Sequence, residues 1–381
     1  MPRKPRRASG RPLPIGAALL FLAIGVVLIS ILWRQEEDAP GEIVLPRAAA
    51  PDHGVTERTR REAFADPFLR IIEAYLNDRR LRVVAGERGI DLICLLPPGG
   101  SSFQVNADLK RAVSHWGGAI SAATEHYVRD LGRAIDLRLS HGGRTYSVRV
   151  MRDETPPGDP RVAIVIDDFG YEKGELAEAF LDLPFPITPS VLPGYARSAW
   201  TVRRAVEKGR QPILHLPMEP KSFPRDDPGP GAILVGMERE AIASVLDRSL
   251  RELAGVGGAS NHMGSRASEV PAIAGAVLGE FARRGLFYLD SGTSDASIFP
   301  AEAARAGVKC LTADLFLDGE EDPTPGSMAR RLAEARRLAE LTGSAILIGH
   351  ARPATLAFLR SSADSLLAGP SRVVPLADLL R

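Results

Sequence analysis

Cysteine is scarce in this sequence, with only Cys94 and Cys310 among 381 residues. Two cysteines allow at most one disulfide, which excludes a disulfide-rich scaffold, and they form no Cys-x-x-Cys metal or redox motif. An excess of charge of one sign is also lacking, because 48 basic residues face 47 acidic ones. This balance argues against a dedicated nucleic-acid-binding protein. Hydrophobic residues reach 45%, which excludes wholesale disorder.

Only one segment is long and apolar enough to cross a membrane. Residues 1–13 carry five basic side chains and no acidic one, and the next 19 residues from Ile15 to Trp33 carry no charge at all. A helix of that length rises roughly 28 Å, about the thickness of the hydrocarbon core. A cleavable signal peptide is the alternative, but its apolar region is usually shorter and no Ala-x-Ala motif directly follows here. We predict a basic cytoplasmic tail over 1–13 and an uncleaved transmembrane anchor over 14–34.

The segment after the anchor divides into a linker and a small domain. Residues 35–60 are polar and rich in proline, alanine and charge, which is typical of a linker. Residues 61–155 mix helical and alternating patterns and predict a small α+β domain. Its expected elements are a helix within 64–75, a strand at 90–96, a helix at 105–117 and a hairpin of strands at 134–139 and 145–151. Its three histidines, His115, His126 and His141, lack ligand spacing, so we interpret them as surface or packed residues.

A second domain is predicted over residues 160–381. Pro156-Pro-Gly-Asp-Pro160 marks the boundary, and short apolar strands then alternate with amphipathic helices. That alternation indicates parallel strands with helices covering them, and about seven units suit a slightly incomplete barrel better than an open sheet. The expected strands are 162–166, 187–192, 212–215, 258–262, 286–289, 308–311 and 345–348. The expected helices are 196–208, 238–253, 270–284 and 328–341, and residues 367–381 add a last strand or short helix.

Polar side chains gather where these strands end. Functional groups of parallel α/β proteins lie at the C-terminal ends of the strands. Asp167 and Asp168 end the first strand, and three of the seven histidines, His215, His262 and His350, end others. Imidazole with carboxylate suits zinc or another divalent transition metal with one position open for water. The sequence therefore predicts a metal site at this rim, with a helix N-cap and a solvated acid as the alternative reading of the aspartate pair.

Six motifs in order carry a resemblance to a known family. They are IVIDDFG, PSVLPG, HLPMEP, NHMGSR, YLDSGTS and IGHARP, and they span about residues 160–380. The series resembles the divergent polysaccharide deacetylases, part of a superfamily that removes acetyl groups from N-acetylated sugars. The resemblance implies an α/β fold with a distorted seven-stranded (β/α) barrel. The small α+β domain and the single transmembrane helix lie outside it.

The resemblance also implies roles for several rim residues. In the superfamily an Asp-Asp pair ends the first strand, with the first aspartate as base and the second as metal ligand, which corresponds to Asp167 and Asp168. A histidine on the last barrel strand acts as general acid, and His350 matches it. The implied reaction is hydrolysis of an acetamide by a metal-activated water, with zinc as the expected metal.

This sequence departs from the family at its second metal motif. The usual third strand carries two histidines, whereas here His215 is kept and Glu219 stands in place of the other. We infer that His262 on the adjacent strand supplies the missing imidazole and that Glu219 is a further ligand or orients a histidine. An Asp-His-Glu site that excludes His262, and a degenerate site that binds sugar without metal, are the alternatives.

Substrate contacts are expected from other strand ends. Arg266, Asp290 and Asp314 are candidates for orienting the hydroxyls or the acetyl group of a sugar, and a buried ion pair or cap is the alternative for each. A glycoside hydrolase that uses two carboxylates is a further alternative, although it leaves the histidines unexplained.

The basic N-terminal flank should stay in the cytoplasm and leave the rest of the chain outside. We therefore expect a single-pass protein of the bacterial inner membrane with its bulk in the periplasm or otherwise outside the cytoplasm. There its substrate would be an N-acetylated glycan such as peptidoglycan, with a cell-envelope protein as a further partner and no nucleic acid. The alternative function is a non-catalytic, carbohydrate-binding or regulatory envelope protein on a degenerate barrel.

Overall fold

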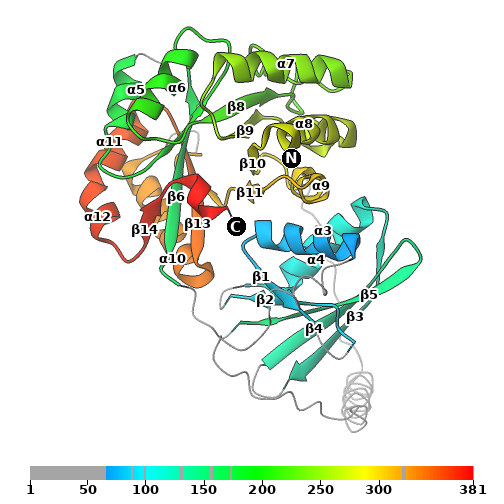
Figure 1. Cartoon of the computed structure of the whole chain (residues 1–381). Coiled ribbons are helices and arrows are strands. Elements are labelled where there is room, and N and C mark those ends of the chain that lie inside the picture. Colours follow the sequence, from blue (N-terminus) through cyan, green and yellow to red (C-terminus); the bar gives the residue numbers. More distant parts are fainter. Residues whose placement is uncertain are drawn as a thin grey trace, which may run out of the picture. The chain divides into compact units, whose positions relative to one another are not determined.

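The computed structural model describes residues 66–380 except 87–88, 98–99, 129–131, 154–157, 172–173 and 320–322 (Figure 1). The described residues all belong to one compact unit. The predicted tail, anchor and linker lie outside the described residues. Within the described part, none of the helices has the length and hydropathy needed to cross a membrane.

The first part of the described chain forms a five-stranded sheet with the strand order β1-β2-β5-β4-β3. The strands are β1 (Arg82–Ala85), β2 (Leu92–Leu96), β3 (Ala119–Val128), β4 (Gly132–His141) and β5 (Arg144–Arg152), and the helices are α3 (Pro67–Asp78) and α4 (Ser102–His115). The predicted hairpin is β4–β5, which turns at Gly142 and Gly143 with φ of 56° and 76°. Glycine adopts this left-handed backbone without a steric penalty. Strands β1 and β3 were not predicted, and most side chains of β3 are exposed, so its sequence lacks apolar alternation.

The remainder forms a nine-stranded parallel sheet with the order β11-β10-β9-β8-β7-β6-β13-β12 and β14 beside β6. The strands are β6 (Arg161–Phe169), β7 (Thr188–Val191), β8 (Ile213–Met218), β9 (Gly258–Met263), β10 (Phe287–Asp290), β11 (Cys310–Thr312), β12 (Leu315–Phe316), β13 (Ser344–His350) and β14 (Arg372–Val374). The prediction of seven strands is corrected to nine. Strand β12 was not expected and has two residues, too few to produce a pattern, whereas β14 lies within residues 367–381, where a last strand or short helix was expected. Among the described residues β11 and β12 do not pair, so the sheet is a half-barrel rather than a closed one.

Helices cover the outside of this half-barrel (Figure 1). They are α5 (Gly174–Leu181), α6 (Ser198–Glu207), α7 (Arg239–Glu252), α8 (Pro271–Arg284), α9 (Phe299–Ala306), α10 (Pro325–Thr342), α11 (Pro353–Ser361) and α12 (Ala363–Ala368), with 3-10 turns at Ala267–Glu269 and Leu376–Leu379. Because both faces of the central strands are covered, β6 is buried along almost its whole length and reads as an apolar run. This buried run ends in Asp167 and Asp168, which places them at the C-terminal rim of the sheet.

The two sheets are joined through α9. Ala301 and Ala304 of α9 belong to the apolar core of the smaller sheet. The Trp116 indole donates a hydrogen bond to the carbonyl of Ala301 at 3.0 Å, and His115 Nε2 lies 2.5 Å from the carboxylate of Glu302. Near the rim, Arg80 pairs with Asp314 of the larger sheet. These contacts fix α3 and α4 against the half-barrel.

We expect the Trp116→Phe variant to lower the free energy of unfolding by about 1–3 kcal/mol, because it leaves the buried Ala301 carbonyl without its donor. Denaturant unfolding of the full chain measures this. The control is Trp200→Phe on α6, a half-buried indole that stacks with Arg197. Equal losses in the two variants would contradict a specific role for the Trp116 hydrogen bond.

Candidate metal centre

Three side chains from three strands converge at the rim. Asp168 is the penultimate residue of β6, His215 lies on β8 and His262 lies on β9. Asp168 Oδ1 is 3.4 Å from His215 Nε2 and 3.2 Å from His262 Nδ1, and the two ring nitrogens are 3.2 Å apart. Among the described residues, these three are the only group of three or more histidine, cysteine, aspartate or glutamate side chains close enough to share a cation.

The triangle of ligand atoms has the size of a metal coordination shell. Ligands bound to zinc at 2.0–2.1 Å with tetrahedral angles lie about 3.3–3.4 Å from one another. The observed separations of 3.2–3.4 Å match this edge length. In addition, Asp168 Oδ1 is buried and makes no hydrogen bond. A buried acceptor without a donor is rare in proteins, and a cation between the three atoms would satisfy it.

A β-bulge explains how two successive aspartates reach one rim. Ile166 pairs with Pro189 but Phe169 pairs with Val191, so β6 holds one extra residue against β7. Asp168 takes up this extra residue with φ of 69° in the left-handed region. Side chains of a regular strand alternate between faces, and a bulge re-aims one of them. Asp167 and Asp168 therefore both lie near His215 Nε2, at 3.7 Å and 3.4 Å.

A chain of hydroxyl groups holds His215 from behind. Its Nδ1 lies 2.9 Å from Ser260 Oγ, and Ser260 Oγ lies 2.8 Å from Ser190 Oγ. Ser190 in turn hydrogen-bonds to Asp167. All four side chains are buried. When His215 donates from Nδ1 to Ser260, its Nε2 lone pair faces the triangle, which is the tautomer that a metal requires. The sequence prediction included neither serine.

The two aspartates have opposite electrostatic environments. Burial raises the pKa of Asp168, but the imidazoles of His215 and His262 lower it more strongly, so this carboxylate is ionised throughout the physiological range. Burial raises the pKa of Asp167 above its ordinary value, with partial offset from His215 and His350. Asp167 Oδ1 is buried and makes no hydrogen bond. One carboxylate thus remains a permanent anion, while the other can exchange a proton.

His350 lies opposite the aspartate pair. Strand β13 pairs with β6 so that His350 is level with Asp167. Its Nδ1 is 2.7 Å from Asp318 Oδ1, while Asp318 Oδ2 accepts hydrogen bonds from the His350 amide and the Thr355 hydroxyl. Burial lowers the pKa of His350, but Asp318 raises it more, so the pKa lies above its ordinary value. Asp318, which the sequence prediction did not include, therefore favours the charged form of His350.

The structure places Glu219 outside the cluster, which corrects its prediction as a metal ligand. Its Oε1 is 2.6 Å from Arg266 and its Oε2 accepts a hydrogen bond from the Val235 amide at 2.6 Å. The chain folds back after β8 so that Ile233 pairs with Met218, and Glu219 binds this returning segment through the Val235 amide. Arg266, predicted to contact sugar, is the partner in this ion pair; its side chain is half exposed, and its contact with sugar stays a prediction. The Asp-His-Glu arrangement without His262 is likewise not the one observed.

Asp290 and Asp314 also do not reach the cluster. Asp290 accepts hydrogen bonds from the Gly292 amide at 2.9 Å and the Ser297 hydroxyl at 2.5 Å. Asp314 pairs with Arg80 and accepts a hydrogen bond from the Ile346 amide at 2.7 Å. Both carboxylates are therefore occupied within the protein. They line a common cavity instead, which is described below.

Comparison with known proteins adds to this geometry. Residues 164–380 match the model of the divergent polysaccharide deacetylase family. An uncharacterized protein of Haemophilus influenzae is 31% identical over 206 residues, which cover 54% of this chain and 72% of the relative. The uncharacterized protein YibQ of Escherichia coli is 29% identical over 206 residues, covering 54% and 63%. The crystal structure of an uncharacterized protein of Agrobacterium tumefaciens superimposes with a TM-score of 0.56 at 26% identity, covering 60% and 91%. The family match covers more than half of the chain, and the chain therefore belongs to the divergent polysaccharide deacetylases.

Proposed function

We propose that this protein is a metal-dependent deacetylase that hydrolyses the acetamide group of N-acetylated sugars. The observation that carries the proposal is the triangle of Asp168, His215 and His262 atoms at 3.2–3.4 Å, flanked by Asp167 and His350. Two imidazoles and one carboxylate are a donor set that zinc favours, with a position left for water or substrate. In this proposal Asp168, His215 and His262 hold the ion.

A divalent ion at this position supplies a Lewis acid for the acetamide carbonyl and lowers the pKa of water. Asp167 is the general base, because its unpartnered Oδ1 is free to accept a proton from the attacking water. His350 is the general acid: Asp318 holds its Nδ1 proton, and its Nε2 proton goes to the leaving amine. Proton transfers of this kind typically contribute about 10²–10⁴-fold to a rate.

The location proposed from the sequence supports a cell-wall substrate. Residues 1–13 would be a cytoplasmic tail, 14–34 an inner-membrane anchor and 35–60 a linker to the domains at 61–155 and 160–381. The folded part would then face the periplasm. Peptidoglycan is the N-acetylated polymer there, so we propose it as the substrate class.

Substitutions of the two neighbouring aspartates should have different effects on zinc binding and on acetate release. We expect Asp168→Asn to lose bound zinc and the release of acetate from N-acetylglucosamine oligomers together. Asp167→Asn should keep zinc and lose about 10²–10⁴-fold in rate. Elemental analysis and an acetate assay on the purified full chain, with and without EDTA, measure both. A wild-type chain that holds zinc yet releases no acetate would support the non-catalytic, carbohydrate-binding alternative instead.

The hydroxyl behind His215 should control metal affinity. We expect Ser260→Ala to weaken zinc binding about 10–100-fold, because the imidazole loses the partner that fixes its tautomer. A competitive chelator titration of the full chain gives the affinity. Ser268→Ala is the matched control, since Ser268 is also buried but its hydroxyl makes no hydrogen bond. Equal affinities for Ser260→Ala and the wild type would show that this contact does not orient the ligand.

The charge of Asp318 should determine the alkaline limit of activity. Asp318 raises the pKa of His350, so Asp318→Asn lowers it. A general acid must be protonated, and activity is lost as the pH rises through its pKa. We therefore expect the alkaline limb of the kcat profile to move to lower pH, while the rate at the acidic end changes less. Asp364→Asn on α12 is the control, and an unshifted alkaline limb in Asp318→Asn would contradict the role of His350.

A further inference from the structure

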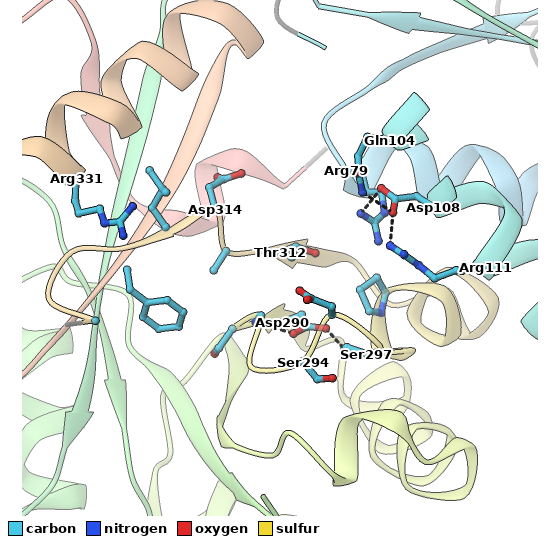
Figure 2. A pocket seen from close by; sticks show the side chains of 18 of the residues that line it. Arg79, Gln104, Asp108, Arg111, Asp290, Ser294, Ser297, Thr312, Asp314 and Arg331 are labelled. Atoms are coloured by element: carbon cyan, nitrogen blue, oxygen red, sulfur yellow. Dashed lines mark hydrogen bonds and ion pairs between the residues drawn. The ribbon is translucent and has the colours of Figure 1, made fainter. Parts of the chain in front are cut away.

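A cavity of about 540 Å³ lies beside the metal centre, between α3 and α4 on one side and the ends of β10 and β11 on the other (Figure 2). Cavities that bind small molecules typically measure roughly 300–1,000 Å³. None of the five residues of the proposed reaction centre lines it. It is therefore a separate space, and the function proposed above gives it no role.

Two contacts connect this cavity with the reaction centre. Phe316 lines the cavity, and its ring stacks on the imidazole of His350 with centroids 6.2 Å apart. Ser291 also lines it, and its amide donates a hydrogen bond at 2.9 Å to the side chain of Asn261, the residue before His262. The ring of Phe316 therefore separates this wall of the cavity from the proposed general acid, His350. The cavity is thus adjacent to the reaction centre on the side of His350.

The opposite wall is an organised set of hydrogen-bond donors. Asp108 on α4 is buried and binds three side chains: Arg79 at 3.1 Å, Gln104 at 3.1 Å and Arg111 at 2.5 Å. A guanidinium has five N–H groups, and the Arg111 side chain is 59% exposed, so several of its donors remain for a ligand. Arg79 Nε is buried without a hydrogen-bond partner. Figure 2 shows these donors facing Asp290, Ser294 and Ser297 across the cavity.

The lining mixes charges of both signs with hydroxyl groups. Three arginines, Arg79, Arg111 and Arg331, accompany the aspartates at 108, 290, 295 and 314. An uncompensated positive lining would favour a polyanion and an apolar lining would favour a lipid. Balanced charge with serine and threonine hydroxyls favours a neutral ligand that has many hydroxyl and amide groups. A glycan has this chemistry, and donors held in place by Asp108 lose little entropy on binding it.

We propose that this cavity is a second glycan subsite, in which Arg79, Gln104 and Arg111 bind sugar units that flank the unit at the metal centre. The proposal rests on the proposed function for the identity of the substrate. It assigns the smaller domain a role in selecting polymers over single sugars. Binding energy far from the reacting bond then holds the chain across the rim.

The test is the binding of the N-acetylglucosamine tetramer to the full chain with its metal removed by EDTA, measured by calorimetry. Arg111→Ala should weaken tetramer binding about tenfold, which corresponds to the loss of roughly one charge-assisted hydrogen bond. Gln104→Ala should weaken it several-fold. The matched control is Arg251→Ala on α7, because Arg251 is also an exposed arginine paired with an aspartate one helical turn earlier. Thermal unfolding checks that each variant is folded.

The kinetic counterpart separates this proposal from the proposed function. With zinc bound, Arg111→Ala should raise KM for the tetramer about tenfold with little change in kcat, and leave the monomer unaffected. Weaker tetramer binding in Arg111→Ala, with no acetate released by any form, would support the subsite and overturn the deacetylase. Acetate release with equal tetramer affinity in Arg111→Ala and the wild type would overturn the subsite alone. A sulfated oligosaccharide that displaces the tetramer at lower concentration would also overturn it.

Discussion

The convergence of Asp168, His215 and His262 on one point organises the rim of this half-barrel. The imidazole nitrogens of His215 and His262 and one oxygen of Asp168 lie 3.2–3.4 Å apart at a buried rim. Polar atoms removed from water without partners are costly, and the cation that we propose at this position would offset that cost. Parallel pairing of β8 with β9 and the bulge in β6 hold the three atoms in place. The surrounding half-barrel serves to maintain this arrangement.

The environment gives chemically identical side chains different roles. His215 contacts a neutral hydroxyl at Nδ1, which leaves Nε2 available as a ligand, whereas His350 contacts a carboxylate at Nδ1, which favours the charged form of the ring. Asp168 is held ionised by two imidazoles, and Asp167 has its pKa raised by burial. The roles proposed for these residues as ligand, base and acid therefore depend on their hydrogen-bond partners and burial as well as on residue type.

The smaller sheet takes part in the same rim. Its helices α3 and α4 pack against α9, and the same α4 presents Gln104 and Arg111 to the cavity beside His350. A rigid contact at Trp116 and Ala301 positions these donors relative to the half-barrel. In our proposal, the larger sheet carries the residues of the reaction, and the smaller domain binds the sugar units that flank the reacting one.

Strand and helix periods are local properties, so the sequence predicted the α/β class, strands β6 to β11 and β13 of the half-barrel, and the aspartates and histidines near their ends. It predicted His262 as the second imidazole but could not exclude Glu219 as a further ligand, since only the fold-back after β8 places Glu219 beside Arg266. Ser190, Ser260 and Asp318 were equally out of reach, because their roles arise from register between strands far apart in the chain. The two-residue strand β12 and the cavity walls also arise only when such segments pack together. Distances between side chains on different strands are set by pairing and bulges, which tertiary structure alone decides.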